Sequence, residues 1–284
     1  MKLTNNQFKL LSELLYRKTG IYLDEKKLYS FSIKIKKRMD ILEINEVDEY
    51  IRYLRFLDRK EEELQHLINL STVNETYFFR DFSQLLIFAE YCIDEIVEKK
   101  KISKDRSFNI WSAGCSIGCE PYTLAIILLE MFDDIHLWDV KILASDIDLN
   151  VLDFAKKAEY TPRSVKDVPP GYLAKYFRKT KEGNYQLINK VKDMVEFVHL
   201  NLSDKNKVRK LRGFDTIFCR NVLIYFDNIS RKQVVNHFYT SLNDGGYIFL
   251  SSTESIGRVT TAFKLKKVEH EGDRYLLYCK EKQK

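Results

Sequence analysis

The sequence has few of the residues that interrupt regular structure. Its 284 residues include only ten Gly and four Pro, so a collagen-like chain or a long Pro- and Gly-rich segment is excluded. No run of about 18 apolar residues is present, which argues against a membrane-spanning helix. Residues 1–5 lack the basic and then apolar pattern of a signal peptide. We therefore expect a cytoplasmic protein that does not insert into a membrane.

The sequence also lacks the clusters from which disulfide frameworks and metal sites are built. The five Cys are odd in number and scattered, which is more typical of reduced thiols. Cys115 and Cys119 lie four residues apart, but no second Cys or His cluster completes a zinc set, so we expect no metal site. A large excess of one charge is missing too. The net charge of +6 does not by itself indicate a nucleic-acid partner.

Residues 1–70 show helical periodicity and no strand pattern, which predicts an all-α N-terminal domain. Apolar side chains recur at helical spacing in four segments, near residues 8–15, 28–42, 47–54 and 64–68. The second segment carries Lys27, Lys34 and Arg38 away from its apolar face, within a stretch that has six basic residues and no acid. We expect this basic stripe to be exposed. It is either a solvated helix face or a docking surface for an acidic partner.

From residue 107 onward, strand-like apolar runs alternate with helical segments. Strands are predicted at residues 108–113, 140–145, 195–200, 216–219, 247–250 and 275–279, and helices at 122–132 and 151–157. This alternation predicts an α/β domain over residues 71–284, with a doubly wound, mostly parallel sheet covered on both faces. Residues 176–194 break the rhythm with two short runs around Glu182-Gly183-Asn184, which predicts an inserted β-hairpin subdomain.

The first predicted strand runs into a loop of small residues, Gly114-Cys115-Ser116-Ile117-Gly118, followed by Cys119-Glu120-Pro121. Such a loop lies at the carboxyl ends of the strands, where α/β sheets bind ligands, and its glycines would let a ligand approach the backbone. The loop is neither a dinucleotide fingerprint nor a P-loop. Glu120 would repel a phosphate and favours a cationic ligand such as S-adenosylmethionine.

Two acids follow the second predicted strand. Asp146, at the strand tip, can accept hydrogen bonds from both hydroxyls of a ribose, by the logic of dinucleotide sites. Its alternative role is that of a helix N-cap, although Asp148 suits that role better because the next helix starts just beyond it.

Polar residues from two other segments are expected beside the same cleft. Arg220 and Asn221 come directly after the fourth predicted strand. Upstream, residues 74–81 interleave polar residues with aromatics. The alternative for this upstream segment is an ordinary amphipathic helix with Asn74 as its cap.

Four segments, in this order, resemble motifs of the CheR family of chemotaxis receptor methyltransferases: residues 74–80, 118–122, 144–148 and 218–226. The resemblance covers nearly the whole chain. It implies a Rossmann-like class I methyltransferase fold with an all-α N-terminal domain and a small inserted β-subdomain. It also implies S-adenosylmethionine as methyl donor, S-adenosylhomocysteine as product, and glutamate side chains of methyl-accepting chemotaxis receptors as acceptors.

The resemblance also implies roles for individual residues. The donor would be bound by Asn74, Thr76, Arg80, Glu120, Asp146, Asn201, Leu202, Asn221 and Val222. Arg80 and Tyr225 would lie nearest the transferred methyl group. The N-terminal helices and the hairpin would touch the receptor, and Lys27, Lys34 and Arg38 would steer its acidic helices.

The chain departs from the family pattern in two places. Ile117 and Cys119 stand where the family has Thr and Glu, whereas Glu120 before Pro121 is kept, so we expect the donor still to bind. The hairpin turn at residues 182–184 lacks the Gly-x-Pro extension of members that dock on a receptor's C-terminal pentapeptide. We therefore expect a pentapeptide-independent enzyme. Separately, we expect the protein to be a monomer.

The implied chemistry needs no strong base, because a free glutamate with a pKa of about 4.3 is already ionised at neutral pH. Catalysis should come from positioning, with Arg80 orienting the carboxylate and Tyr225 shaping the pocket at the methyl group. Two alternatives remain open. A nucleic-acid methyltransferase is less favoured because Arg220-Asn221-Val222-Leu223 stands where an Asn/Asp-Pro-Pro-aromatic turn is usual. A non-catalytic binding module is left open by Ile117 and Cys119.

Overall fold

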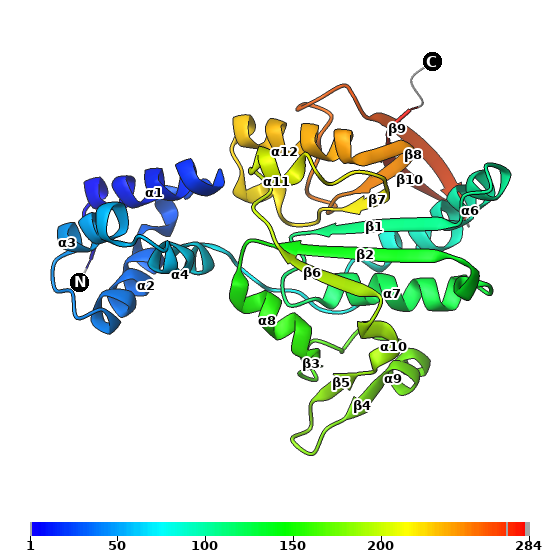
Figure 1. Cartoon of the computed structure of the whole chain (residues 1–284), viewed down its shortest axis with the longest axis horizontal. Coiled ribbons are helices and arrows are strands. Elements are labelled where there is room, and N and C mark those ends of the chain that lie inside the picture. Colours follow the sequence, from blue (N-terminus) through cyan, green and yellow to red (C-terminus); the bar gives the residue numbers. More distant parts are fainter. Residues whose placement is uncertain (1, 271, 282–284) are drawn as a thin grey trace.

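The computed structural model describes residues 2–270 and 272–281. Figure 1 shows three parts: a group of N-terminal helices, a large twisted sheet with helices on both faces, and a small second sheet. Within the described ranges, no helix has both the length and the apolar composition needed to cross a membrane.

Four helices build the N-terminal part, as the sequence predicts: α1 (Asn5–Thr19), α2 (Leu28–Ile41), α3 (Val47–Arg52) and α4 (Glu62–Ser71). Helix α1 starts at a capping box, in which the Thr4 side chain accepts from the amide of Gln7 and the Gln7 side chain accepts from that of Thr4. Apolar faces of the helices form one core, with Leu11, Ile35 and Leu67 fully buried. This core is separate from those around the large sheet.

Lys27, just before α2, and Lys34 and Arg38, within it, do not form the exposed stripe expected from the sequence. Arg38 is mostly buried and forms a bidentate ion pair with Glu63, at 3.0 Å from Nε to Oε1 and 2.6 Å from Nη2 to Oε2. The ammonium of Lys34 donates to the carbonyl of Leu70 at 2.5 Å. Lys27 lies over the ring of Tyr225, 5.4 Å from its centroid. The expectation of a freely exposed stripe is therefore wrong, because each of the three side chains folds back onto the protein.

The large sheet has the order β6-β2-β1-β7-β8-β10-β9. Its strands are β1 (Ser107–Ala113), β2 (Asp139–Asp146), β6 (Val195–His199), β7 (Phe214–Phe218), β8 (Leu242–Phe249), β9 (Lys264–His270) and β10 (Asp273–Cys279). The first five pair in parallel, and β10 is antiparallel to β8 and β9. The mostly parallel, doubly wound sheet is thus confirmed. The order in which strands are added to the sheet reverses between β1 and β7, since β2 and β6 lie on one side and β8 on the other. Ligands of doubly wound sheets bind at such a switch point.

Alternate strand residues face two different cores, which is why both faces carry helices. Phe108, Ile110 and Phe218 face one core, while Trp111 and Ile217 face the other. The first core packs against α6 (Ile93–Ile102) and α7 (Cys119–Met131), and the second packs against α12 (Asn228–Ser241). The remaining helices near the sheet are α5 (Phe82–Ile87), α8 (Leu149–Lys157) and α11 (Lys205–Val208).

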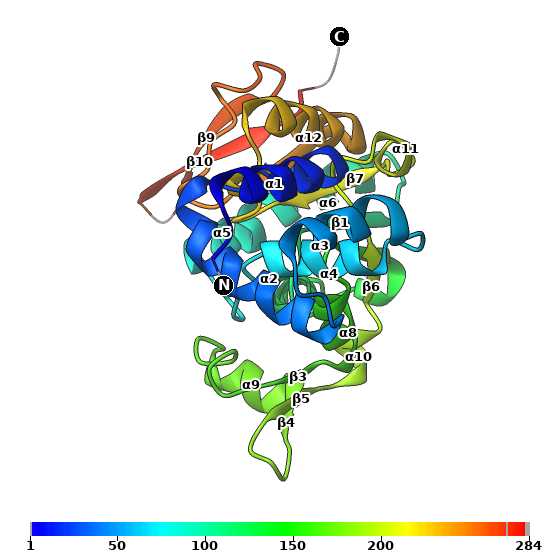
Figure 2. The ribbon, with the colours of Figure 1, turned by 90° about the vertical axis from the view of Figure 1, so that its left-hand side faces the viewer.

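The small sheet has three antiparallel strands in the order β3-β5-β4: β3 (Glu159–Tyr160), β4 (Phe177–Lys179) and β5 (Tyr185–Leu187). The hairpin predicted within residues 176–194 supplies β4 and β5, and β3 comes from earlier in the chain. Helices α9 (Pro170–Tyr176) and α10 (Asn189–Lys192) flank it. Figure 2 shows this unit projecting away from the large sheet.

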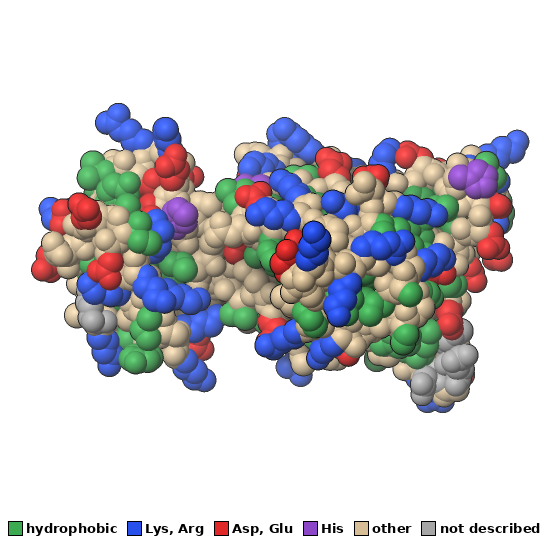
Figure 3. All heavy atoms as spheres, turned by 90° about the horizontal axis from the view of Figure 1, so that it is seen from below, with side chains coloured by type: hydrophobic (Ala, Val, Ile, Leu, Met, Phe, Trp, Pro, Cys, Tyr) green, Lys and Arg blue, Asp and Glu red, His purple; other side chains and the backbone are tan. Residues whose placement is uncertain are grey.

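The small sheet and its flanks are strongly basic. Residues 156–192 contain ten Lys or Arg and three Asp or Glu, which gives +7 against +6 for the whole chain. Nine of the ten basic residues are exposed. In Figure 3, which views the molecule from the side of this unit, Lys and Arg side chains spread across it. The positive charge of the chain is therefore concentrated on one projecting surface.

Candidate functional site

A pocket lies at the carboxyl ends of β1, β2, β6 and β7 and contains about 1010 Å³ of empty space, its open mouth included. Every residue that the sequence analysis assigned to the donor lines it: Asn74, Thr76, Arg80, Glu120, Asp146, Asn201, Leu202, Asn221 and Val222. Tyr225 lines it too. Segments separated by up to about 150 residues along the chain thus meet at one place, as strand topology requires.

The two glycines of the loop after β1 differ in their relation to the pocket, because Gly114 lines it and Gly118 does not. Gly114 has a φ of 83°, and a Cβ there would lie 2.3 Å from Cγ2 of Val222. Gly118 has a φ of 85°, and its Cβ would lie 2.9 Å from that of Ala155. The expectation that both glycines let a ligand approach is therefore wrong for Gly118, whose missing side chain brings α8 close to the loop. At Gly114 the space is filled by Val222, which itself lines the pocket.

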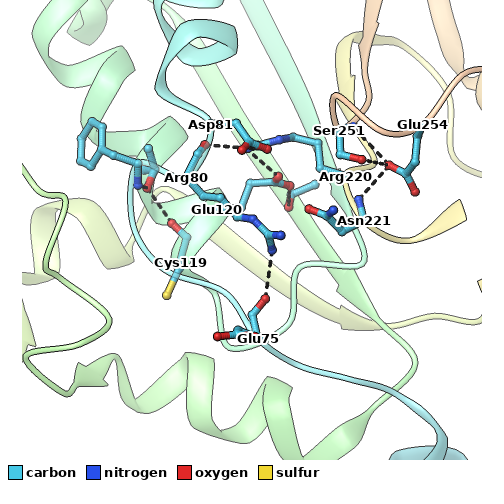
Figure 4. A network of polar contacts seen from close by, with 12 residues as sticks. Glu75, Arg80, Asp81, Cys119, Glu120, Arg220, Asn221, Ser251 and Glu254 are labelled. Carbon is cyan, nitrogen blue, oxygen red and sulfur yellow. Dashed lines mark hydrogen bonds and ion pairs between the residues drawn. The ribbon is translucent and has the colours of Figure 1, made fainter. Parts of the chain in front are cut away.

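Glu120 lies in the first turn of α7 and belongs to a buried charge network (Figure 4). Its carboxylate accepts from Ser112 Oγ at 2.7 Å and from Arg220 Nη1 at 3.3 Å. The same guanidinium contacts Asp81 at 2.8 Å and donates to the carbonyl of Arg80 at 2.6 Å. Burial raises the pKa of Glu120, while Arg220 and the Ser112 hydroxyl act in the opposite direction. The network links the ends of β1 and β7 to the segment after α4.

Asp146 ends β2 at the pocket wall and is nearly buried. Its Oδ2 accepts from the amide of Ser116 at 2.8 Å, and its Oδ1 accepts from that of Asp148 at 3.0 Å. Each carboxylate oxygen keeps a lone pair for a further donor. Burial raises the pKa of Asp146 to about 6. The N-cap alternative is excluded for Asp146, because Asp148 caps α8 by accepting from the amides of Asn150 and Val151.

Residues 73–80 form a strap that connects α4 to α5 and covers one side of the pocket. The Tyr225 hydroxyl accepts from the amide of Val73 and donates to its carbonyl, both at 3.1 Å. Asn74 donates from its side chain to Asp148 at 2.9 Å. No helix starts at Asn74, so the alternative of an ordinary amphipathic helix is excluded. Tyr225 therefore fastens the strap to the turn after β7.

Arg80 sits at the end of the strap with spare hydrogen-bonding capacity. In the parts of the chain that the structure describes, its guanidinium donates one hydrogen bond, from Nη1 to the carbonyl of Glu75 at 3.0 Å. A guanidinium has five N–H groups, so further donors face the pocket that Arg80 lines. Asn221 and Thr76 also have side-chain polar groups that are free to bind a ligand. Their side chains line the pocket and make no hydrogen bond within residues 2–270 and 272–281.

The N-terminal helices close the pocket from another side. Thr19 and Ile21 line it, and Ile21 forms a β-bridge with Phe226. The side-chain amide of Asn201 donates a hydrogen bond to the carbonyl of Lys18 at 2.8 Å. Asn201, which was predicted to bind S-adenosylmethionine, therefore also joins the two domains. No sequence pattern pointed to Thr19 or Ile21, because nothing in a helix pattern indicates contact with a loop about 200 residues away.

The two departures from the family pattern point away from the pocket. Cys119 is fully buried in the core beneath α7, where burial raises the pKa of its thiol. Ile117 packs against the same core, and its carbonyl accepts from the Tyr160 hydroxyl at 2.8 Å. Neither residue lines the pocket. The acid that does line it, Glu120, is the one that the sequence shares with the family pattern.

Comparison with known proteins matches both domains. Residues 74–271 match the family model described as CheR methyltransferase, SAM binding domain, and residues 6–72 match CheR methyltransferase, all-alpha domain. Chemotaxis protein methyltransferase 2 of Vibrio cholerae serotype O1 is 41% identical over 265 residues, which cover 93% of this chain and 91% of that protein.

More distant relatives align over similar lengths. The chemotaxis protein methyltransferase of Borreliella burgdorferi is 33% identical over 260 residues, or 90% of each chain. That of Escherichia coli K12 is 29% identical over 271 residues, which cover 94% of this chain and 90% of that protein. The chain therefore belongs to the CheR family of methyltransferases, and residues 74–271 form its S-adenosylmethionine-binding domain.

Proposed function

We propose that this methyltransferase esterifies glutamate side chains of methyl-accepting chemotaxis receptors in the cytoplasm, acting as a monomer. The proposal rests on one observation: the same pocket has a side lined by a cationic residue and a side lined by carboxylates. Arg80 supplies free guanidinium donors that suit an acceptor carboxylate. Glu120 and Asp146 supply carboxylates that suit a cationic donor bearing a ribose. A site with both kinds of side chain fits the transfer of a methyl group from a sulfonium to a carboxylate.

The reaction forms a C–O bond and breaks a C–S bond. An oxygen of the glutamate carboxylate attacks the methyl carbon of S-adenosylmethionine, and S-adenosylhomocysteine leaves as a neutral thioether. No proton moves, so the pocket needs no general base. Arg80 holds the acceptor carboxylate, while Tyr225 shapes the wall beside the methyl group and fastens the strap. The rate gain comes from aligning the two reactants and excluding water.

We assign the binding of S-adenosylmethionine to pocket residues whose side chains can still form hydrogen bonds. Asn221 and Thr76 offer unpaired polar groups, and Asp146 keeps lone pairs for the ribose hydroxyls. Asn74, Asn201, Leu202 and Val222 complete the walls. These assignments predict that S-adenosylmethionine and S-adenosylhomocysteine bind competitively.

The charge distribution supports an acidic, helical acceptor. Receptor methylation helices carry Glu and Gln, and the +7 surface of residues 156–192 lies on the same molecule as the pocket. The turn between β4 and β5 is tight, since Thr180 and Asn184 are joined by a backbone hydrogen bond at 2.8 Å. A turn of this kind offers no extension for a pentapeptide, so docking is assigned to the methylation helices themselves. Of the three basic residues in and just before α2, Lys27 and Lys34 remain candidates for receptor contact, whereas Arg38 is already paired with Glu63.

The test is incubation of the enzyme with radiolabelled S-adenosylmethionine and membranes that carry the receptors. Label on the receptor band that is released by mild base indicates carboxyl methyl esters. Base-stable label, or label on RNA added in parallel, would contradict the proposal. Membranes in which the receptor lacks its last five residues should be labelled equally well. Loss of labelling with these membranes would contradict the pentapeptide-independent assignment alone.

A further inference from the structure

Glu254, in the loop after β8, reaches across to the turn after β7 (Figure 4). Its Oε2 accepts from the backbone amide of Asn221 at 2.8 Å, and its Oε1 accepts from that of Ile224 at 3.3 Å. Oε2 also accepts from the amide and the hydroxyl of Ser251, at 3.1 and 2.8 Å. Glu254 does not itself line the pocket. One carboxylate thus binds two amides of a turn that lies 30 residues earlier in the sequence.

That turn needs an external acceptor because of its backbone conformation. Asn221 has a φ of 59°, in the left-handed region, which Asn adopts more readily than most residues with a side chain. The amide of Asn221 donates to Glu254, and without this acceptor it would lose its hydrogen-bond partner. The turn carries three pocket-lining residues: Asn221, Val222 and Tyr225. Its conformation therefore decides where these side chains point.

The charge of Glu254 is also unusual in its surroundings. Within residues 2–270 and 272–281 it forms no ion pair with Lys or Arg, and its hydrogen-bond donors are neutral. The pKa of the Tyr225 hydroxyl at the pocket wall is raised mainly by burial and further by the charges of Asp146 and, least, Glu254, while the Val73 backbone and Arg80 lower it. A carboxylate without a paired cation, set behind the wall of a pocket for a cationic donor, adds to the attraction of Glu120 and Asp146.

We infer that Glu254 is a positioning residue for methyl transfer, which holds the turn of residues 220–225 in the form that binds S-adenosylmethionine and aligns Tyr225. The inference rests on the proposed function, since it deepens the role of the same pocket. A purely local role is the competing explanation, because Ser251 and Glu254 also stabilise their own turn. The two explanations predict different effects on S-adenosylmethionine affinity when the Ser251 hydroxyl is removed.

The experiment compares three variants of the full chain, Glu254→Ala, Glu254→Gln and Ser251→Ala, by S-adenosylmethionine affinity, melting temperature and receptor methylation. Glu254→Ala removes the acceptor for Asn221, and we expect its Kd for the donor to rise roughly 10- to 100-fold, the range of a lost hydrogen bond to a charged group. Glu254→Gln keeps one acceptor oxygen, and a rise of about 3- to 10-fold is expected. Ser251→Ala keeps both amide contacts and should stay within about threefold of wild type.

The kinetic pattern separates positioning from loss of folding. Glu254→Gln should raise KM for the donor and lower kcat, while KM for the receptor and the melting temperature stay near wild-type values. Wild-type donor affinity in Glu254→Gln would overturn the inference, even if Glu254→Ala does not fold. A loss in Ser251→Ala equal to that in Glu254→Ala would also overturn it, in favour of the local role. Failure of the wild-type chain to methylate receptors would instead refute the proposed function.

Discussion

The guanidinium of Arg220 lies 3.3 Å from Oε2 of Glu120, and this contact pairs the residue that follows β7 with the first turn of the helix that follows β1. Both side chains are largely withdrawn from solvent, at 4% and 14% exposure. The Nε of Arg220 is buried without a hydrogen-bond partner among the described residues, so this guanidinium is not fully satisfied. Glu120 therefore interacts with a fixed cation on one side and faces the pocket for a mobile one on the other.

Replacing Glu120 by Gln should weaken S-adenosylmethionine binding about 10- to 100-fold, because a charge-assisted contact to the cationic donor is lost. It should also lower the free energy of unfolding by about 1–3 kcal/mol, since Arg220 loses one of its two carboxylate partners. Isothermal titration and urea unfolding measure the two effects. Ser112→Ala is the matched control: it removes the hydroxyl that touches Glu120 but keeps the charge. Equal donor affinity in Glu120→Gln and wild type would contradict the assignment.

Donor affinity should depend on pH through Asp146, whose pKa burial raises to about 6. The folded, ligand-free protein holds this proton more tightly than the unfolded chain does. Protonated Asp146 therefore adds stability that is fully present below about pH 4 and is lost as the pH rises through about 6. Ribose hydroxyls donate to the ionised form, so affinity should fall as the pH drops below 6, approaching tenfold per pH unit.

Titrations with S-adenosylmethionine between pH 5 and pH 8 measure this dependence. Asp146→Asn should bind weakly at every pH, and its affinity should vary much less across the range. If the affinity of Asp146→Asn still falls with decreasing pH as steeply as that of wild type, a group other than Asp146 causes the pH dependence.

Removing the Tyr225 hydroxyl should slow methylation more than it destabilises the fold. Tyr225→Phe loses the hydrogen bonds to both backbone groups of Val73, so the strap is less firmly held over the pocket. We expect kcat to fall about 5- to 30-fold, the equivalent of one or two hydrogen bonds, with a change of only a few degrees in melting temperature. Single-turnover methylation assays give this rate. An unchanged kcat would show that the strap does not depend on Tyr225.

Arg38 should behave as a structural residue and not as a receptor contact. Arg38→Ala leaves the carboxylate of Glu63, which is 2% exposed, without its cation, and should cost about 3–5 kcal/mol of unfolding free energy. Lys37→Ala, one position away and exposed, should change stability by less than about 0.5 kcal/mol. Chemical denaturation of the two variants tests the contrast. A stable Arg38→Ala variant with impaired receptor methylation would restore the docking role.

Much of the fold and site could be predicted from the sequence because the residues involved sit at the ends of strands. Asp146 and Asn221 each follow an apolar run, and parallel strands bring such ends to one edge of the sheet. The six predicted strands of the large sheet are all present. The prediction of Asp148 as N-cap was also correct, because a cap depends only on its nearest neighbours.

The rest depended on contacts between distant segments. The pattern of α2 placed Arg38 on a polar face, but its partner, Glu63, lies 25 residues later on α4. Strand β9 (Lys264–His270) was not predicted, since Lys and Glu interrupt its apolar positions at the edge of the sheet. The true role of Gly118 required the position of Ala155, which no loop pattern contains. Glu254 gave no signal in the sequence, because its contacts with the turn after β7 are made to backbone amides, which no side-chain pattern reveals.

The strap of residues 73–80 is both the covalent link between the two domains and a wall of the pocket. Because Thr19 and Ile21 of the helical domain also line the pocket, the donor site is not contained in residues 74–271 alone, and a fragment that begins at Phe82 would further lack Asn74, Thr76 and Arg80. Cleavage of this one segment by a protease should abolish binding at once, and bound donor should protect it from cleavage. Both domains thus contribute to the one pocket that binds the donor.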